Sequence, residues 1–117
     1  MRDHKKLRAF ELAKEVVINT YKAVSIFPRE ELYGLTSQIK RAAVSVPSNI
    51  VEGCSRDSQA DYLRFLYISY GSLRELHYQL DLSNRLGFLE QGRWLQLQPK
   101  LIETEKVLNG LIRSLRD

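Results

Sequence analysis

A proline interrupts the stretch that most constrains how this chain folds. Apolar residues recur at helical spacing on both sides of it, at Ile39, Ala43, Val46 and Ile50. The opposite row is polar and consists of Arg41, Ser45, Ser48 and Glu52. The pattern predicts one helix from about residue 35 to residue 53, with Pro47 in its interior.

A proline at this place has a cost that the fold must offset. Pro47 removes one backbone donor and crowds the carbonyl of Ala43, which costs about 3 kcal/mol in an exposed helix interior. We expect a kink that lets the helix follow a curved core, with Ser48, Asn49 or a water molecule meeting the freed carbonyl. The alternative is a kink that shapes a subunit contact or a ligand groove.

Three further amphipathic helices are predicted. The first covers about residues 3–26, with Asp3 as its candidate N-cap, and Phe27-Pro28 ends it. Its apolar face combines two rows, formed by Leu7, Phe10, Ala13, Val17, Tyr21 and Val24 and by Ala9, Leu12, Val16, Ala23 and Ile26.

The third and fourth helices are the longest. Ser55 or Ser58 can cap the third helix, which runs to about Leu86 or Gly87. Gly71 in its middle costs about 1 kcal/mol relative to alanine, and a close approach between helices would offset that cost. The fourth covers about residues 89–116, and Ile102 and Ile112 widen its apolar stripe. Either it kinks at Pro99, or a short helix precedes a main helix that begins there.

These elements predict the fold class. No segment shows the strict alternation of a half-buried strand. Four amphipathic helices joined by short links predict an all-α, antiparallel up-down-up-down four-helix bundle, with residues 1–117 as a single domain. Gly53 is the expected C-terminal cap of the second helix.

Composition limits the classes of function. Cys54 is the single cysteine and cannot form an intrachain disulfide. No apolar run approaches the roughly 20 residues of a membrane helix, and residues 1–6 are charged rather than signal-like. We therefore expect a cytoplasmic protein with no membrane partner.

No set of residues indicates catalysis. The two histidines, His4 and His77, lie far apart, and no metal-ligand spacing or glycine-rich phosphate loop is present. His77 and Asp81 are spaced to pair on one helix, but no nucleophile or substrate pocket is indicated beside them. We expect no enzyme activity, no cofactor and no small-molecule substrate.

Basic charge is the remaining polar feature. The net charge is +4 and the pI about 9.3, which permits an anionic partner. The candidate nucleic-acid-binding residues are Lys5, Lys6, Arg8, Lys40, Arg41, Arg56 and Arg64. Acidic residues are interleaved with them, so the alternative is an ordinary solvated surface.

Aromatic residues gather on the third helix. Exposed aromatics on a helix often mark a protein interface. The candidate subunit contact consists of Tyr67, Tyr70, Gly71 and Tyr78. The alternative is that a thick bundle buries most of them.

Several motifs together indicate a family. The segment from Val44 to Gly53 reads Val-Ser-Val-Pro-Ser-Asn-Ile-Val-Glu-Gly. Other matching segments are Phe27-Pro28-x-x-Glu31-x-Tyr33-Gly34-Leu35, Gly71-Ser72-Leu73-x-Glu75-Leu76 and Leu108-x-x-Leu111-Ile112-x-x-Leu115. Over nearly its whole length the chain resembles the bacterial four-helix-bundle family encoded in intervening sequences of large-subunit ribosomal RNA genes. It is also similar to the accessory protein of diversity-generating retroelements.

The resemblance carries its own expectations. It implies an antiparallel four-helix bundle that assembles as a ring, typically a homopentamer, without enzyme activity. It marks as a structural signature Pro47, Ser48, Asn49, Glu52 and Gly53. The leading hypothesis is an oligomeric protein that binds structured RNA or DNA through its basic surface. The alternative is an interaction scaffold that docks another protein and does not bind nucleic acid.

Overall fold

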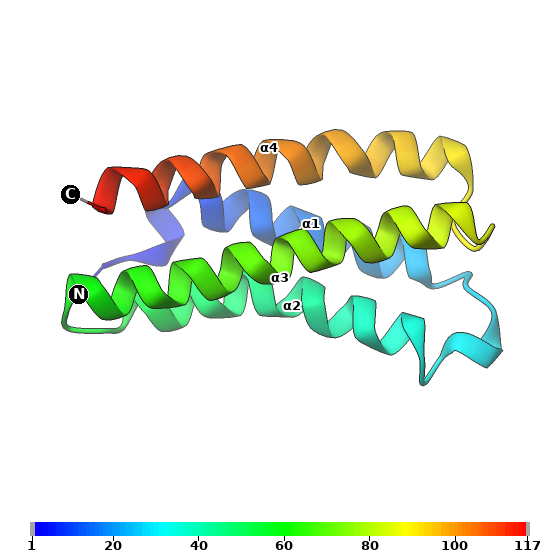
Figure 1. Cartoon of the computed structure of the whole chain (residues 1–117), viewed down its shortest axis with the longest axis horizontal. Coiled ribbons are helices and arrows are strands. Elements are labelled where there is room, and N and C mark those ends of the chain that lie inside the picture. The colour runs from blue at the N-terminus through cyan, green and yellow to red at the C-terminus, as the bar shows by residue number, and fades with distance from the viewer. Residues whose placement is uncertain (1, 117) are drawn as a thin grey trace.

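In the computed structural model, which describes residues 2–116, the chain forms four α-helices. They are α1 (Arg8–Val24), α2 (Leu35–Cys54), α3 (Gln59–Arg85) and α4 (Gln91–Leu115). Two short 3₁₀-helices, η1 (His4–Lys6) and η2 (Arg29–Glu31), precede α1 and α2. Successive helices run in opposite directions (Figure 1), which confirms the predicted up-down-up-down bundle.

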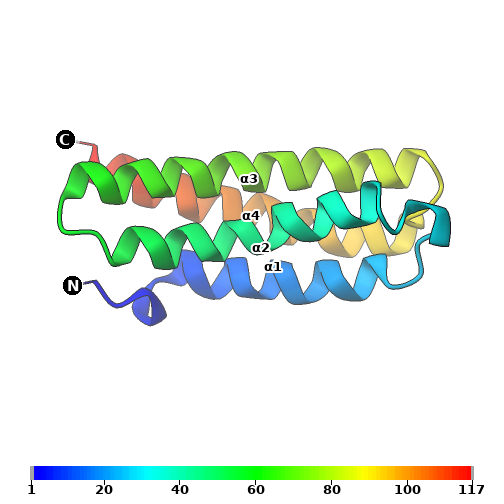
Figure 2. The same cartoon turned by 90° about the horizontal axis from the view of Figure 1, so that it is seen from below.

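The helices occupy the corners of a square. Both α1 and α3 pack against α2 and α4, so the α1/α2 face lies opposite the α3/α4 face. Figures 1 and 2 show that the two ends of the chain and the α2–α3 turn lie at one end of the bundle. None of these helices, over the described residues, combines the length and apolarity needed to cross a membrane.

The core follows the predicted spacing with three exceptions. The α2 row of Ile39, Ala43, Val46 and Ile50 is fully buried. Tyr21 and Ile102 are instead exposed on the outer sides of α1 and α4, and Ile26 is exposed because it lies in the turn after α1. The expected core positions at Tyr21 and Ile26 were therefore wrong, as was Ile102 in the apolar stripe of the fourth helix.

The start of the first helix also differs from the prediction. Asp3 caps η1 rather than α1: its Oδ1 accepts the Lys5 N–H at 3.0 Å. The extended backbone of Leu7 (φ −88°, ψ 127°) then separates η1 from α1, so the long helix begins at Arg8. Ser58 caps α3 as one of the two predicted candidates, and its hydroxyl accepts the Asp61 N–H at 3.1 Å.

Both interior prolines lie inside continuous helices. α4 runs through Pro99, so no separate main helix begins there. α2 likewise runs through Pro47. Asn49 was one of the groups expected to bond to the Ala43 carbonyl, but it does not. Its Nδ2 instead donates to the carbonyl and to the hydroxyl of Ser45, each at 2.9 Å.

Hydroxyl groups join α2 to α3 around the proline. Ser69 Oγ donates to the Val46 carbonyl at 2.7 Å, and the hydroxyls of Ser45 and Ser72 share a hydrogen bond of 2.8 Å. A hydrogen bond of this kind typically contributes about 1 kcal/mol. These bonds fix the position of α3 beside the turn of α2 that contains the proline.

Within the bundle, neither Gly53 of α2 nor Gly71 of α3 has the role predicted for it. Gly53 is not the cap of α2, which continues to Cys54. It is buried inside the helix, where a Cβ would lie 3.0 Å from Phe65 Cβ and 3.1 Å from Tyr62 Cδ1. A Cβ added at Gly71 would have no neighbouring atom within 4 Å, so no close contact between helices of the bundle requires a glycine there. The close approach therefore belongs to Gly53.

These surroundings predict opposite effects of one substitution. Gly53→Ala should destabilise the fold by about 1–3 kcal/mol, because the added methyl overpacks the α2–α3 contact. Gly71→Ala should stabilise the fold by about 0.5–1 kcal/mol through helix propensity. Urea denaturation followed by circular dichroism measures both. Equal effects of the two substitutions would contradict this assignment of the close approach.

Candidate nucleic-acid interface

The up-down topology collects basic residues at one end of the bundle. The start of the chain, the α2–α3 turn and the last turn of α4 meet there (Figure 1). The cationic end, as defined here, consists of Arg2, Lys5, Lys6, Arg56, Arg64, Arg113 and Arg116. Four of these, Lys5, Lys6, Arg56 and Arg64, belong to the set predicted from the sequence.

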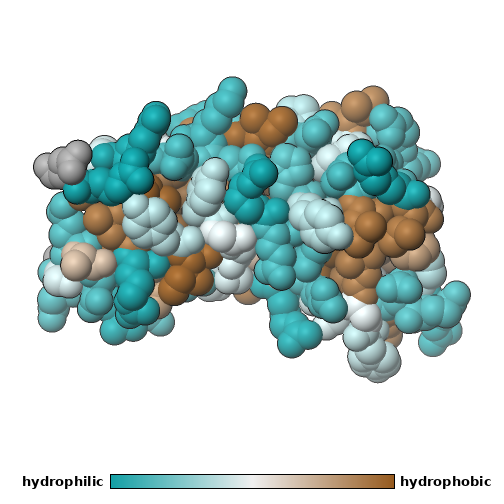
Figure 3. All heavy atoms as spheres, viewed as in Figure 1, coloured by the Kyte–Doolittle hydropathy of each residue, from teal (hydrophilic) through white to brown (hydrophobic). Residues whose placement is uncertain are grey.

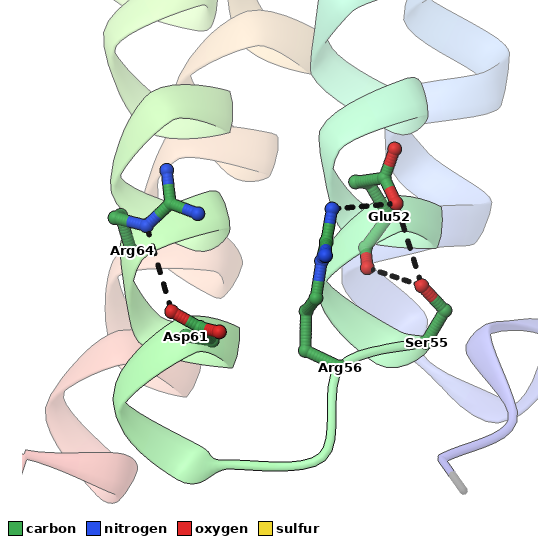
Figure 4. Close-up of polar contacts among 5 residues, drawn as sticks. All are labelled: Glu52, Ser55, Arg56, Asp61 and Arg64. Carbon is green, nitrogen blue, oxygen red and sulfur yellow. Dashed lines mark hydrogen bonds and ion pairs between the residues drawn. The ribbon is translucent and has the colours of Figure 1, made fainter.

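Two arginines flank the α2–α3 turn. Arg56 Nη2 lies 3.2 Å from Glu52 Oε2, and Arg64 Nε lies 3.7 Å from Asp61 Oδ1. Figure 4 shows both ion pairs. Ser55 Oγ donates to the Glu52 carbonyl at 2.7 Å. Ion pairs between exposed side chains are typically worth less than about 1 kcal/mol. A phosphate group can therefore compete with these carboxylates for both guanidinium groups.

Aromatic rings contact three of the five arginines at this end. The guanidinium carbons of Arg56 and Arg64 lie 4.7 and 4.4 Å from the centroid of the Phe65 ring. Arg2 lies 4.1 Å from the Tyr62 ring centroid and donates to the Arg56 carbonyl at 2.9 Å. These contacts reduce the conformational freedom that the cations would lose on binding an anion.

The lysines of η1 complete the surface. Lys5 and Lys6 are exposed, and neither forms an ion pair within residues 2–116. Arg8, which was predicted with them, points to α4 instead, where its Nη2 lies 2.6 Å from Glu103 Oε2. Of the four predicted residues at the cationic end, Lys5 and Lys6 are therefore the two whose charge is not paired with a carboxylate.

The remaining two predicted residues lie elsewhere. Lys40 and Arg41 are near the start of α2, and Arg56 follows its end. Arg56 lies fifteen positions after Arg41, and because most of these positions are in α2 the two residues are on the order of 20 Å apart. The fold does not bring Lys40 and Arg41 to the cationic end, so the predicted set does not form one continuous surface.

The sequence prediction omitted three members of this end. Arg2, Arg113 and Arg116 were not among its candidate binding residues. The predicted topology could have identified these residues, because an up-down four-helix bundle brings the start of the chain, the loop between the second and third helices and the end of the chain together. Arg113 and Arg116 belong to the last turn and the C-cap of α4, where cations also complement the helix dipole.

The pairing of His77 with Asp81 that their spacing on α3 allows does not form. His77 does not pair with Asp81, which contacts Arg85 at 3.4 Å. His77 Nδ1 instead lies 2.7 Å from Glu105 Oε2 on α4, and Arg74 Nη1 lies 3.0 Å from the other oxygen of the same carboxylate. Glu105 is buried. The arrangement is a polar link between α3 and α4, with all its carboxylate oxygens engaged.

Burial perturbs two groups behind the cationic end. Burial raises the pKa of the Cys54 thiol, which makes it a poor nucleophile, and raises the pKa of Tyr62 to about 12. Across the described part of the chain, no group of three or more His, Cys, Asp and Glu side chains could hold a metal ion.

The tyrosine shift predicts how stability depends on pH. Between pH 10 and pH 12 the unfolded chain loses a Tyr62 proton that the folded chain keeps, so stability falls as pH rises. The slope from this group approaches about 1.4 kcal/mol per pH unit. Tyr62→Phe should flatten the decline measured by urea denaturation at pH 9, 10 and 11. Tyr33→Phe, which alters an exposed tyrosine, is the control and should leave the decline unchanged.

The predicted subunit contact lies on the outer side of α3. Tyr67 and Tyr78 are 46% and 64% exposed, and Gly71 is also exposed, whereas Tyr70 is half-buried. A thick bundle therefore does not bury most of these residues. Figure 3 shows that hydrophobic atoms on the side viewed in Figure 1 lie in separate patches divided by hydrophilic side chains.

Comparisons with known proteins agree with this architecture. Residues 5–110 match the sequence model described as 23S rRNA-intervening sequence protein. A crystal structure of a protein of unknown function from the S23 ribosomal protein family of Bacteroides thetaiotaomicron superposes with a TM-score of 0.81 and 22% sequence identity. The similarity covers 89% of this chain and 97% of that one. No curated protein sequence matches the chain.

Proposed function

The chain belongs to the 23S rRNA-intervening sequence protein family, and from that premise we propose that it is a non-catalytic, oligomeric protein of the cytoplasm that binds nucleic acid. The proposed surface is the cationic end. The observation that carries the proposal is the convergence of seven basic residues there from the chain start, the α2–α3 turn, the second turn of α3 and the end of α4. The chemistry that they fit is a run of backbone phosphates in structured RNA or DNA.

Assembly strengthens the proposal. A single chain carries a net charge of +4, whereas a ring of five copies carries five times that charge. A cyclic ring with its bundles side by side places every cationic end on the same face. Phosphate contacts then add, and the affinity gains the steep salt dependence of multiple released counterions.

The α3 tyrosines support assembly. We propose that Tyr67, Tyr70, Gly71 and Tyr78 lie at the contact between copies, most naturally in a pentamer. Large aromatic side chains such as Tyr67 and Tyr78 are enriched at the centres of protein interfaces. Gly71, which nothing contacts within the bundle, would let a neighbouring helix approach closely.

Two charge reversals test the binding surface. Lys5→Glu with Lys6→Glu should weaken binding to a labelled RNA hairpin at least tenfold and lower the salt slope by about 2, because two phosphate contacts are lost. Lys40→Glu with Arg41→Glu changes the net charge equally and is the matched control, expected to retain most of the affinity. Fluorescence anisotropy titrations from 50 to 200 mM salt measure both.

Either of two results would overturn this surface. Equal losses in the two double variants would mean that the total charge, and not the cationic end, sets the affinity. No binding of RNA or duplex DNA by the native protein at 50 mM salt would exclude nucleic-acid binding altogether and favour the alternative function.

Light scattering tests the assembly. The native protein at micromolar concentration should have the mass of five chains of 13.6 kDa. Tyr78→Glu should lower that mass, since it buries a charge in the proposed contact. Tyr33→Glu alters a tyrosine that is 93% exposed away from α3 and should leave the mass unchanged. A native mass of one chain would exclude the ring.

An apolar groove on the α1/α2 face supports a second candidate function. In this reading the protein is an interaction scaffold or adaptor that docks another protein and makes no direct contact with nucleic acid. The groove is lined by residues such as Tyr21, Leu32 and Val44. The two functions differ in the anisotropy experiment, because a scaffold of this kind leaves the labelled RNA unbound at every salt concentration.

A further inference from the structure

A groove opens where α1, α2 and the loop after η2 meet. Its volume is about 680 Å³. α1 contributes Tyr21, the loop contributes Leu32 and Tyr33, and α2 contributes Ser37, Lys40, Arg41, Val44 and Ser45. None of these residues belongs to the cationic end. The groove is therefore a second surface, separate from the proposed phosphate-binding surface.

Aliphatic and aromatic side chains extend the groove into a strip along the α1/α2 face. Tyr21, Leu32 and Val44 are exposed although they are apolar or largely so. Ile18, three residues before Tyr21, and Val51, two helical turns after Val44, are exposed in the same rows. An extended exposed apolar strip of this kind marks an interaction site more often than an ordinary surface.

The groove is also cationic. Lys40 Nζ lies 5.1 Å from the centroid of the Tyr21 ring, and Arg41 is on the same wall. No acidic side chain lines the groove within the described chain. Outside the groove, Glu31 on η2 accepts the Leu35 N–H at 3.3 Å, and Glu75 on α3 lines a neighbouring hollow together with Arg41. A partner with carboxylates or phosphates at the edge of its contact surface would therefore gain binding affinity from Lys40 and Arg41.

The chemistry of the groove favours a protein partner over a nucleic acid. Bases bind by stacking on aromatic rings and by contacts of their polar edges. Leu32, Val44 and Ile18 offer neither, but they suit the apolar stripe of an amphipathic helix laid between two helices. The hydroxyls of Tyr21 and Tyr33 can donate to carboxylates on that helix.

Charge argues against α4 of a second copy of this chain as the occupant. The exposed apolar residues of α4, Leu95 and Ile102, share one stripe with Lys106 and Arg113. Docking that stripe into the groove of another copy would place these cations against Lys40. A helix with acidic residues beside its apolar stripe avoids the repulsion and pairs with Lys40 and Arg41.

We infer that the α1/α2 groove binds an acidic amphipathic helix of a partner protein. Leucine-like side chains of that helix pack between Tyr21, Leu32 and Val44. Its carboxylates meet Lys40 and Arg41. The site remains accessible when the cationic end is occupied, so one molecule can hold an acidic protein and a nucleic acid together.

A designed peptide tests the groove without knowledge of the natural partner. The probe is a fluorescein-labelled helical peptide of about 18 residues with leucines at i, i+4, i+7 and i+11 and glutamates beside them. The control peptide has the same composition in scrambled order. The native protein should bind the probe at least tenfold more tightly than the scrambled peptide, as measured by anisotropy at 150 mM salt.

Protein variants locate the binding. Val44→Glu should weaken binding of the probe at least tenfold, and Lys40→Glu with Arg41→Glu should weaken it and reduce its salt dependence. Ile102→Glu is the matched control, because Ile102 is 38% exposed and Val44 is 40% exposed, and should have no effect. Leu32→Gln, in the loop, repeats the test outside the helices. Melting curves by circular dichroism establish that each variant is folded.

Several outcomes would overturn the inference. Equal affinity for the probe and the scrambled peptide would show that the face attracts acidic peptides only through general charge, and undiminished binding by folded Val44→Glu and Leu32→Gln would place the peptide elsewhere. Loss of RNA-hairpin affinity in Val44→Glu would make the groove a nucleic-acid site. A fall of the native assembly to single chains in Val44→Glu would make it a contact between copies.

Discussion

The close approach of α2 and α3 at Gly53 is the constraint on which the functional end depends. A side chain at this position would push α3 away, because Phe65 Cβ lies only 3.0 Å from where its Cβ would be. The approach puts the Phe65 ring within reach of Arg56 from the turn and Arg64 from α3. If α2 and α3 lay farther apart, the Phe65 ring could contact Arg64 of its own helix but not Arg56. The packing of two helices thus determines where two cations stand.

The hydroxyl bonds between the same two helices explain how α2 tolerates its proline. Pro47 costs about 3 kcal/mol in an exposed helix. The bonds from Ser69 to the Val46 carbonyl and between Ser45 and Ser72, together with that from Asn49 to Ser45, are each worth about 0.5–1.5 kcal/mol. Their sum is comparable with the cost of the proline. The proline is therefore compensated by side chains of α3 and of the next helical turn.

Periodicity predicted the helices and most of the core because each helix buries one continuous row, as with Ile39 to Ile50 on α2. It could not separate the centre of a wide apolar face from its edge, so Tyr21 was placed in the core. It also could not decide which helix a long side chain reaches: Arg8 bonds to Glu103, and His77 bonds to Glu105 rather than Asp81. Such contacts depend on tertiary neighbours, which local spacing does not encode.

The side of the family segment, residues 44–53, that packs against α3 is largely separate from the candidate binding surfaces, whereas Val44 and Val51 of that segment belong to the exposed strip of the α1/α2 face. Ser45 and Asn49 participate in the hydrogen bonds on the α3 side of α2, and Gly53 packs against α3, so their chemistry is largely used within the fold. The surfaces available to partners are built from Lys5 and Lys6 at one end and from residues such as Tyr21 on the α1/α2 face. A chain can therefore keep the signature and the bundle while its surfaces change. What a particular member binds must be derived from those surfaces, since the residues that identify the fold are engaged in holding it together.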